Sequence, residues 1–86
     1  MEVAFKPSFL RELKKLPTPL REEVLEKIEL FKDPSSHPAL KVHKLHGELK
    51  KYLSFSVNYR YRIVFAWEVP NKSAILMAIG DHSVYD

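Results

Sequence analysis

A concentration of basic and imidazole side chains in the middle of the chain is the part of the sequence best suited to chemistry on an anion. Between Asp33 and Glu68 the only acidic residue is Glu48. The same stretch contains these basic residues and histidines: Lys41, Lys44, Lys50, Lys51, Arg60 and Arg62, with His37, His43 and His46. Such a positive field favours an anionic partner, with nucleic acid as the first candidate and an acidic protein segment as the second. The alternative is a solvated basic loop without a partner.

Arg62 and Arg60 lie in a segment where polar and apolar residues alternate, which predicts a strand. If its apolar face packs under helices, both guanidiniums project from the open side of the sheet. The planar fork of Arg62 fits two oxygens of one phosphate. The residues better suited to sequence-independent phosphate contacts are Lys44, Lys50, Lys51 and Arg60. A structural ion pair of Arg62 with Glu68 or with a helix carboxylate is the alternative.

The composition excludes several kinds of site. The chain has no cysteine, which rules out disulfides, thiolate zinc sites and a cysteine nucleophile, and its two glycines rule out a glycine-rich phosphate loop. His43 and His46 stand three residues apart, but no third ligand is evident, so we expect neither a metal nor another cofactor. Residues 81–83 contain the types of a catalytic triad, yet sequence neighbours cannot face one another as a triad requires.

The remaining pattern indicates one α+β domain over residues 1–86, because a chain of this length has room for a single modest core. We expect a short strand at 2–6 and two helices, capped by Ser8 and Thr18, that fold back as a hairpin around Pro17. Three strands should follow, at 52–57, 60–69 and 74–79, with residues 34–47 as an irregular connection. Short turns make these strands antiparallel neighbours, so the predicted order is β-α-α-β-β-β with the helices on one face of the sheet.

The sequence contains no sign of a membrane segment. Its longest apolar run, residues 74–79, is far shorter than the ~20 residues that a membrane-spanning helix needs. Residues 1–6 lack the basic and then apolar pattern of a secretion signal. We therefore expect a cytoplasmic protein without a membrane partner.

Three short segments in a fixed order resemble a known family. They are Lys44-Leu45-His46-Gly47, Tyr61-Arg62-Ile63-Val64-Phe65 and the ending Ile79-Gly80-Asp81-His82-Ser83-Val84-Tyr85. Together they resemble the RelE/ParE superfamily of type II toxin–antitoxin toxins over essentially the whole chain, and residues 54–58 resemble its RelE/StbE branch. The resemblance implies a metal-independent endoribonuclease that cleaves mRNA in the ribosomal A site and inhibits translation. It also implies a cognate antitoxin, through which alone the toxin would meet operator DNA.

The resemblance assigns the catalytic roles position by position. Arg62 matches the strand arginine of RelE-type toxins, and Tyr85 matches their C-terminal tyrosine. The two lysines of RelE fall at Leu53 and Phe55, and its second arginine falls at His82. In the histidine-dependent YafQ branch, two histidines match His43 and His82, whereas a further His and Asp fall at Ser56 and Arg60. The resemblance therefore implies a mixed site made of His43, Arg62, His82 and Tyr85.

RNA cleavage by the 2′-hydroxyl needs a base, an acid for the leaving oxygen and cationic donors for the phosphate. Because histidine is the side-chain type that titrates near neutrality, His82 is the first candidate for proton transfer, and Tyr85 would stack on a base or donate its hydroxyl. Two other functions remain open. One is a ParE-type toxin that binds DNA gyrase without nuclease activity, and the other is a catalytically degenerate member that binds an antitoxin.

Overall fold

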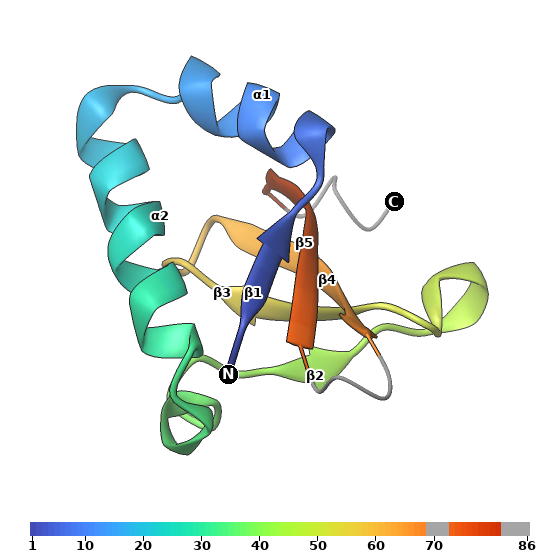
Figure 1. Cartoon of the computed structure of the whole chain (residues 1–86). Helices are drawn as coiled ribbons and strands as arrows, with labels where there is room; N and C mark the ends of the chain where they lie inside the picture. The colour runs from blue at the N-terminus through green and yellow to red at the C-terminus, as the bar shows by residue number, and fades with distance from the viewer. Residues whose placement is uncertain (69–72, 82–86) are drawn as a thin grey trace.

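Two helices lie on one side of a five-stranded sheet in the computed structural model, which describes residues 1–68 and 73–81 (Figure 1). The elements are β1 (Val3–Phe5), α1 (Pro7–Lys15), α2 (Thr18–Phe31), β2 (His43–Lys44), β3 (Leu53–Ser56), β4 (Arg62–Glu68) and β5 (Ser73–Gly80), with 3₁₀ turns at Pro34–Ser36 and Gly47–Leu49. The predicted α+β class is confirmed. Neither helix in this part of the chain is long and apolar enough to cross a bilayer.

The sheet has the strand order β1-β5-β4-β3-β2. β1 runs parallel to β5, while the other three pairings are antiparallel. The register between β4 and β5 shifts between Val64 and Phe65, which marks a bulge. Because β5 lies between β1 and β4, it is an interior strand of the sheet, as its apolar sequence predicts.

β2 was not predicted, because residues 34–47 were expected to form an irregular connection. The strand is only two residues long, and His43 and Lys44 have no periodic pattern. It forms because β3 offers a free edge, on which His43 pairs with Ser54 and Lys44 pairs with Leu53. Tertiary pairing rather than local propensity therefore creates this strand.

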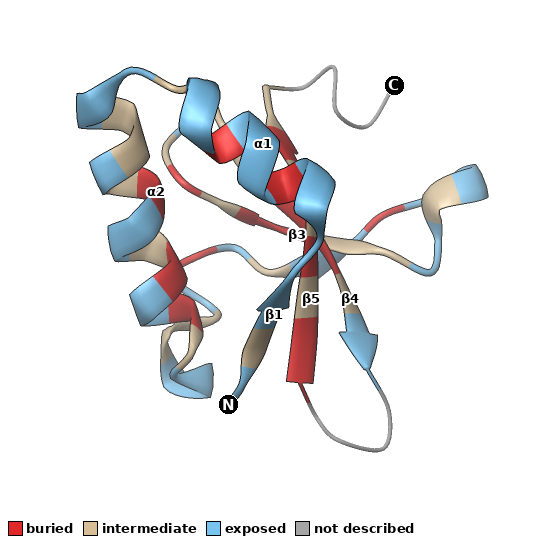
Figure 2. Cartoon of the chain, turned by 45° about the horizontal axis from the view of Figure 1, so that its top comes forward, coloured by how far each residue is buried: buried red, intermediate tan, exposed pale blue. Residues whose placement is uncertain are grey.

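The core fills the space between the helices and the sheet (Figure 2). Its fully buried members include Phe9 of α1, Phe31 of α2 and the strand residues Phe55 and Phe65. The ring of Phe31 stacks on that of Phe55 with centroids 4.2 Å apart and meets Phe65 edge-on at 4.8 Å. Burial of these side chains supplies most of the stabilisation that a small domain can obtain.

Both helices begin without the side-chain caps that Ser8 and Thr18 were predicted to provide. α1 begins at Pro7 and α2 at Thr18, and neither N-cap makes a side-chain hydrogen bond. Proline fits the first turn because its missing N–H would have had no helical acceptor there. Ser8 instead donates its hydroxyl to the backbone oxygen of Met77 at 3.5 Å.

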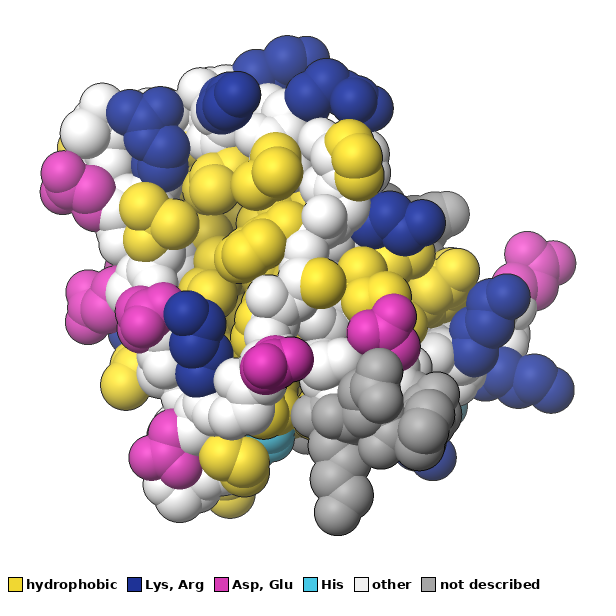
Figure 3. All heavy atoms as spheres, in the orientation of Figure 1, with side chains coloured by type: hydrophobic (Ala, Val, Ile, Leu, Met, Phe, Trp, Pro, Cys, Tyr) yellow, Lys and Arg dark blue, Asp and Glu magenta, His cyan; other side chains and the backbone are white. Residues whose placement is uncertain are grey.

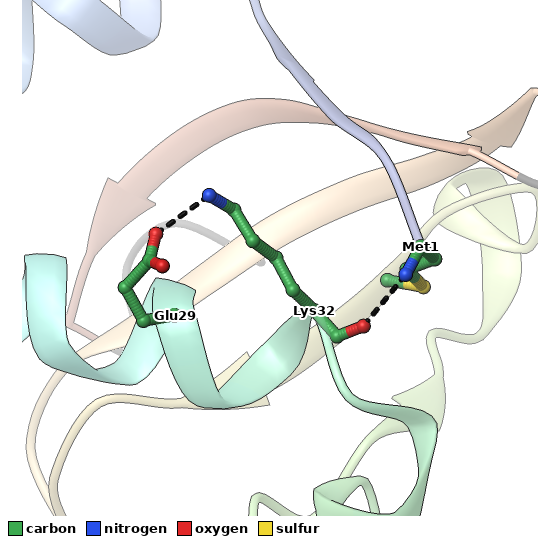
Figure 4. A network of polar contacts seen from close by, with 3 residues as sticks. All are labelled: Met1, Glu29 and Lys32. Atoms are coloured by element: carbon green, nitrogen blue, oxygen red, sulfur yellow. Dashed lines mark hydrogen bonds and ion pairs between the residues drawn. The ribbon is translucent and has the colours of Figure 1, made fainter.

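The C-terminal end of α2 is held by groups from three places in the chain. His37 donates from Nε2 to the backbone oxygen of Phe31 at 2.9 Å. The Met1 ammonium donates to the backbone oxygen of Lys32 at 2.8 Å, and Lys32 Nζ pairs with Glu29 Oε2 at 2.6 Å (Figure 4). The donors of His37 and Met1 satisfy backbone carbonyls that a helix end leaves without partners, whereas Lys32 pairs with a carboxylate.

Asp33 begins the first 3₁₀ turn directly after α2. Its side chain accepts the backbone N–H of Ser35 at 3.0 Å and the hydroxyl of Ser35 at 2.9 Å. The backbone N–H and then the hydroxyl lower the pKa of the Asp33 carboxyl. The charged form of Asp33 therefore favours the sharp turn that sends the chain from α2 toward β2.

We expect His37→Ala to lower the free energy of unfolding by about 1–2 kcal/mol, because it removes both the bond to Phe31 and an aromatic stacking contact. The His37 ring lies 4.9 Å from that of Phe31. Denaturant unfolding monitored by circular dichroism measures the change. His46→Ala is the matched control, since His46 is exposed and its removal should change stability by no more than about 0.5 kcal/mol. Equal effects of the two changes would contradict the capping role of His37.

Candidate active site

Arg62 begins β4 and turns its guanidinium back along the connection from β3. Its Nη1 donates to the backbone oxygens of Asn58 at 2.6 Å and Tyr61 at 3.1 Å. The side chain is half-buried, because these contacts hold the guanidinium against the connection from β3. Both contacts use Nη1, so Nη2 and Nε have no hydrogen-bond acceptor among residues 1–68 and 73–81 and suit the oxygens of a ligand.

No carboxylate neutralises Arg62 within residues 1–68 and 73–81. The one ion pair there joins Lys32 to Glu29. Glu68, a predicted alternative partner of Arg62, accepts instead from the hydroxyl of Ser73 at 3.0 Å. Among the described residues, the guanidinium charge is therefore not held in a structural ion pair.

Asn58 fixes the connection that holds Arg62. Its Oδ1 accepts the backbone N–H groups of Arg60 at 2.9 Å and Tyr61 at 2.8 Å, which is typical of an Asx turn. Its Nδ2 donates to Glu23 Oε1 at 2.7 Å. The bond to Glu23 thus anchors the turn to α2, and the anchored turn positions Arg62.

His43 of β2 lies on the same face of the sheet as Arg62. His43 pairs with Ser54, Ser54 pairs with Val64, and Ser56 pairs with Arg62. Residues opposite one another share a face, as do residues two apart on a strand. Two strand spacings and one two-residue step separate the Cα atoms of His43 and Arg62 by roughly 12 Å. Side chains of these lengths can approach one nucleotide from two sides.

The exposed ring of His43 has a defined tautomer when neutral. Its Nδ1 lies 2.8 Å from the backbone oxygen of Lys41. Because a carbonyl oxygen only accepts, Nδ1 carries the proton of this bond. Nε2 of the neutral imidazole then has the free lone pair, which is the arrangement a general base needs.

Lys41 links the surroundings of His43 and Arg62. Its backbone oxygen holds the His43 ring, and the residue lines the same pocket as Arg62. Its φ is 58°, in the left-handed region that lysine rarely adopts. Lys41 is not among the predicted site residues, because nothing in a lone lysine between Leu40 and Val42 signals this conformation.

The C-terminal candidates His82 and Tyr85 lie outside the described residues. Gly80, two positions before His82 in the sequence, is the residue of β5 that pairs with Arg62. This register agrees with the prediction that the chain ending begins near the arginine. The proximity of His82 and Tyr85 to Arg62 stays a prediction.

The predicted phosphate-binding residues Lys44, Lys50, Lys51 and Arg60 are all exposed, but they do not form one patch. Lys44 pairs with Leu53, the first residue of β3. Lys50 and Lys51 lie just before the same strand in the sequence. Arg60 belongs to the connection beyond the other end of β3, with its guanidinium carbon 5.6 Å from the centroid of the Tyr61 ring. A ligand that contacts both the three lysines and Arg60 must therefore extend along the length of β3.

In the part of the chain described by the structure, no three His, Asp or Glu side chains gather in a way that could hold a metal ion. His43 binds a backbone oxygen, and His46 precedes the second 3₁₀ turn.

The sequence model of a family described as RelE-like toxins of the type II toxin–antitoxin system HigB matches residues 11–81. The chain belongs to this family. This RelE-like toxin has no significant match among curated protein sequences.

Solved structures show the same fold for the RelE-like toxin. The toxin–antitoxin complex RelBE2 of Mycobacterium tuberculosis contains a chain with 23% identity and a TM-score of 0.76, over 94% of this chain and 96% of that chain. A chain of the DinJ–YafQ complex of E. coli has 16% identity and a TM-score of 0.73, over 96% of this chain and 93% of that chain. A chain of the RelE–RelB complex of Pyrococcus horikoshii has 17% identity and a TM-score of 0.72, over 93% of this chain and 92% of that chain. The predicted membership of the RelE/ParE superfamily is confirmed.

Of the four catalytic candidates in this RelE-like toxin, the structure describes Arg62 and His43 and places them on one face. The alternation around Arg62 was enough to locate its strand. The position of His43 was found by resemblance alone, since β2 has no periodic signal. The contacts that orient both side chains come from backbone oxygens, which a sequence does not reveal.

Proposed function

We propose that the protein is an endoribonuclease that cleaves mRNA in the ribosomal A site and thereby inhibits translation. Membership of the RelE-like toxins supports this function, and so does the grouping of an exposed histidine with an arginine that has no carboxylate partner among residues 1–68 and 73–81. The observation that carries it is the link through Lys41, which holds the His43 ring and shares a pocket with Arg62. This arrangement combines a proton acceptor with a phosphate-binding cation.

In the proposed reaction, His43 Nε2 takes the proton of a ribose 2′-hydroxyl while its oxygen attacks the adjacent phosphorus. The bond from phosphorus to the 5′-oxygen breaks, and this oxygen takes a proton from an acid. The products are a 2′,3′-cyclic phosphate and a 5′-hydroxyl. Arg62 stabilises the negative charge that grows on the phosphate oxygens. We assign the acid to His82, with Tyr85 stacking on a base or donating its hydroxyl.

The test is in vitro translation with primer-extension mapping of mRNA cuts, run beside a gyrase supercoiling assay. We expect cuts in translated mRNA and unchanged supercoiling. Inhibited supercoiling without cuts would establish the ParE-type alternative. Neither effect, combined with binding of an antitoxin, would establish a degenerate member.

We also propose that a cognate antitoxin binds this protein in the cytoplasm and provides its only link to operator DNA. The antitoxin complexes of the structural relatives support this partnership. Figure 3 shows apolar side chains exposed between the two helices, and exposed apolar surface is typical of a binding site. Leu10 of α1 and Leu25 of α2 are 41% and 46% exposed. We expect an acidic antitoxin segment to cover Arg62 and shield it from chemical modification.

Replacing Lys44, Lys50, Lys51 and Arg60 together should weaken RNA or ribosome binding and flatten its salt dependence. The slope of log K against log salt should fall by about 0.7 for each single-strand phosphate that the variant no longer binds. Binding measured at several salt concentrations checks this, while the mapped cut positions should stay the same. An unchanged slope would show that these four cations do not contact phosphates.

A further inference from the structure

A pocket of about 350 Å³ opens at the end of the sheet beside Arg62. Three segments form it: the C-terminal half of α2, the loop around Lys41, and the connection from β3 to β4. The pocket is lined by Lys27 of α2, by Lys41 of the loop and by Arg62 at the start of β4, directly after the connection. Positive side chains from separate parts of the chain therefore converge on one hollow.

These three cations have no carboxylate partner among residues 1–68 and 73–81, where the one ion pair is Lys32 with Glu29. Glu23, one turn before Lys27 on α2, accepts a hydrogen bond from Asn58 rather than an ion pair from the lysine. Like charges gathered around one hollow repel one another, and a bound anion removes this repulsion. The charge pattern thus points to an anionic occupant.

Tyr59 adds a flat aromatic surface to the same pocket. It is 91% exposed, the highest value among the large apolar side chains of the described residues. An exposed ring contributes little to the core, but it offers a base a face on which to stack. An acidic peptide would use the cations and leave this ring without a function, so the combination favours a nucleotide.

Lys41 supplies an independent sign that the pocket is built for binding. Its left-handed backbone, with φ at 58°, is easier for asparagine or glycine. Strained residues of this kind cluster at ligand sites, where the side chain is needed more than an easy backbone. A lysine at this position keeps a positive charge at the edge of the pocket at a cost in backbone strain.

We propose that this pocket is a nucleotide subsite that binds a phosphate of single-stranded RNA through Lys27, Lys41 and Arg62 and stacks the base on Tyr59. The inference rests on the proposed function, because it names where the same substrate is held beside the scissile phosphate. Tyr59 and the two lysines act in binding and not in proton transfer.

The experiment is a titration of the whole 86-residue chain with a short 2′-O-methyl oligoribonucleotide, followed by heteronuclear NMR. The 2′-O-methyl group removes the nucleophile, so binding is measured without cleavage. We expect shift changes at Lys27, Lys41 and Tyr59, and a dissociation constant that rises roughly 5- to 100-fold in Tyr59→Ala, as loss of one stacked base predicts. Tyr59→Phe keeps the ring and should bind like the wild type.

The lysines are tested with Lys27→Gln combined with Lys41→Asn. The salt slope should fall by about 0.7 for each phosphate that the double variant no longer binds. Thermal unfolding should show equal or higher stability, because asparagine suits the left-handed backbone of residue 41. Lys14→Gln with Lys15→Gln, at the exposed end of α1, is the charge-matched control and should leave binding unchanged.

Unchanged binding in Tyr59→Ala and in the double lysine variant, while the wild type still cuts mRNA, would overturn the subsite and leave the proposed function standing. Absence of both oligonucleotide binding and mRNA cuts in the wild type would overturn both. Loss of binding to poly-glutamate but not to the oligonucleotide in these variants would overturn the subsite in favour of an acidic peptide.

Discussion

Replacing Arg62 with alanine is expected to lower the rate of mRNA cleavage about 10²–10³-fold, because it removes the main cationic donor for charge that grows on the phosphate. Single-turnover cleavage of a translated message measures the effect. Alanine also removes the donor to the backbone oxygens of Asn58 and Tyr61, so unfolding should become easier by about 1–2 kcal/mol. A domain of this size should still be folded at moderate temperature.

Arg62→Lys separates charge from geometry. Lysine keeps a positive charge but lacks the planar fork, so we expect it to restore part of the binding and little of the rate. Arg60→Ala is the control, since Arg60 lies in the adjoining connection and should affect binding alone. A wild-type cleavage rate in folded Arg62→Ala would show that the arginine is structural.

His43→Ala is expected to lower the cleavage rate about 10²–10⁴-fold, as loss of a general base does. Added imidazole should restore part of the rate. Binding of a non-cleavable RNA should hardly change, since His43 is exposed and is assigned to proton transfer.

His43→Asn is the variant that keeps the local structure. The Asn amide can still donate to the backbone oxygen of Lys41, but it provides no base. We expect it to be as inactive as the alanine variant while thermal unfolding stays at the wild-type temperature. If His43→Asn cleaves at the wild-type rate and His82→Ala does not, the base is His82 and the assignment of His43 is wrong.

Much of the fold could be predicted because its strands and helices follow simple periods. Apolar spacings of three and four residues located both helices, and alternation located β3 and β4 around the break at Asn58. β2 could not be predicted, since its two residues become a strand only through pairing with β3. The helix starts were misplaced because proline in the first turn makes a side-chain cap dispensable.

The site was predictable as a set of residue types but not as a geometry. Resemblance located Arg62 and His43, yet their orientation depends on the backbone oxygens of Asn58, Tyr61 and Lys41. The unusual conformation of Lys41 and the exposure of Tyr59 appear only after the loops are folded. The residue types in the sequence therefore indicate candidate acids and bases but not the surface that we propose for substrate binding.

The place of β5 in the sheet has a consequence for how the protein is made. β5 pairs with β1 from the start of the chain and with β4, and it is the last strand in the order of synthesis. The sheet therefore stays incomplete on the translating ribosome until residues 73–80 have left the exit tunnel, because β1 has no neighbour before then. Arg62, whose ladder partner in β5 is Gly80, gains its final surroundings only at that moment. Until β5 is in place, β4 lacks one of its two neighbouring strands, so the candidate site around Arg62 is incomplete.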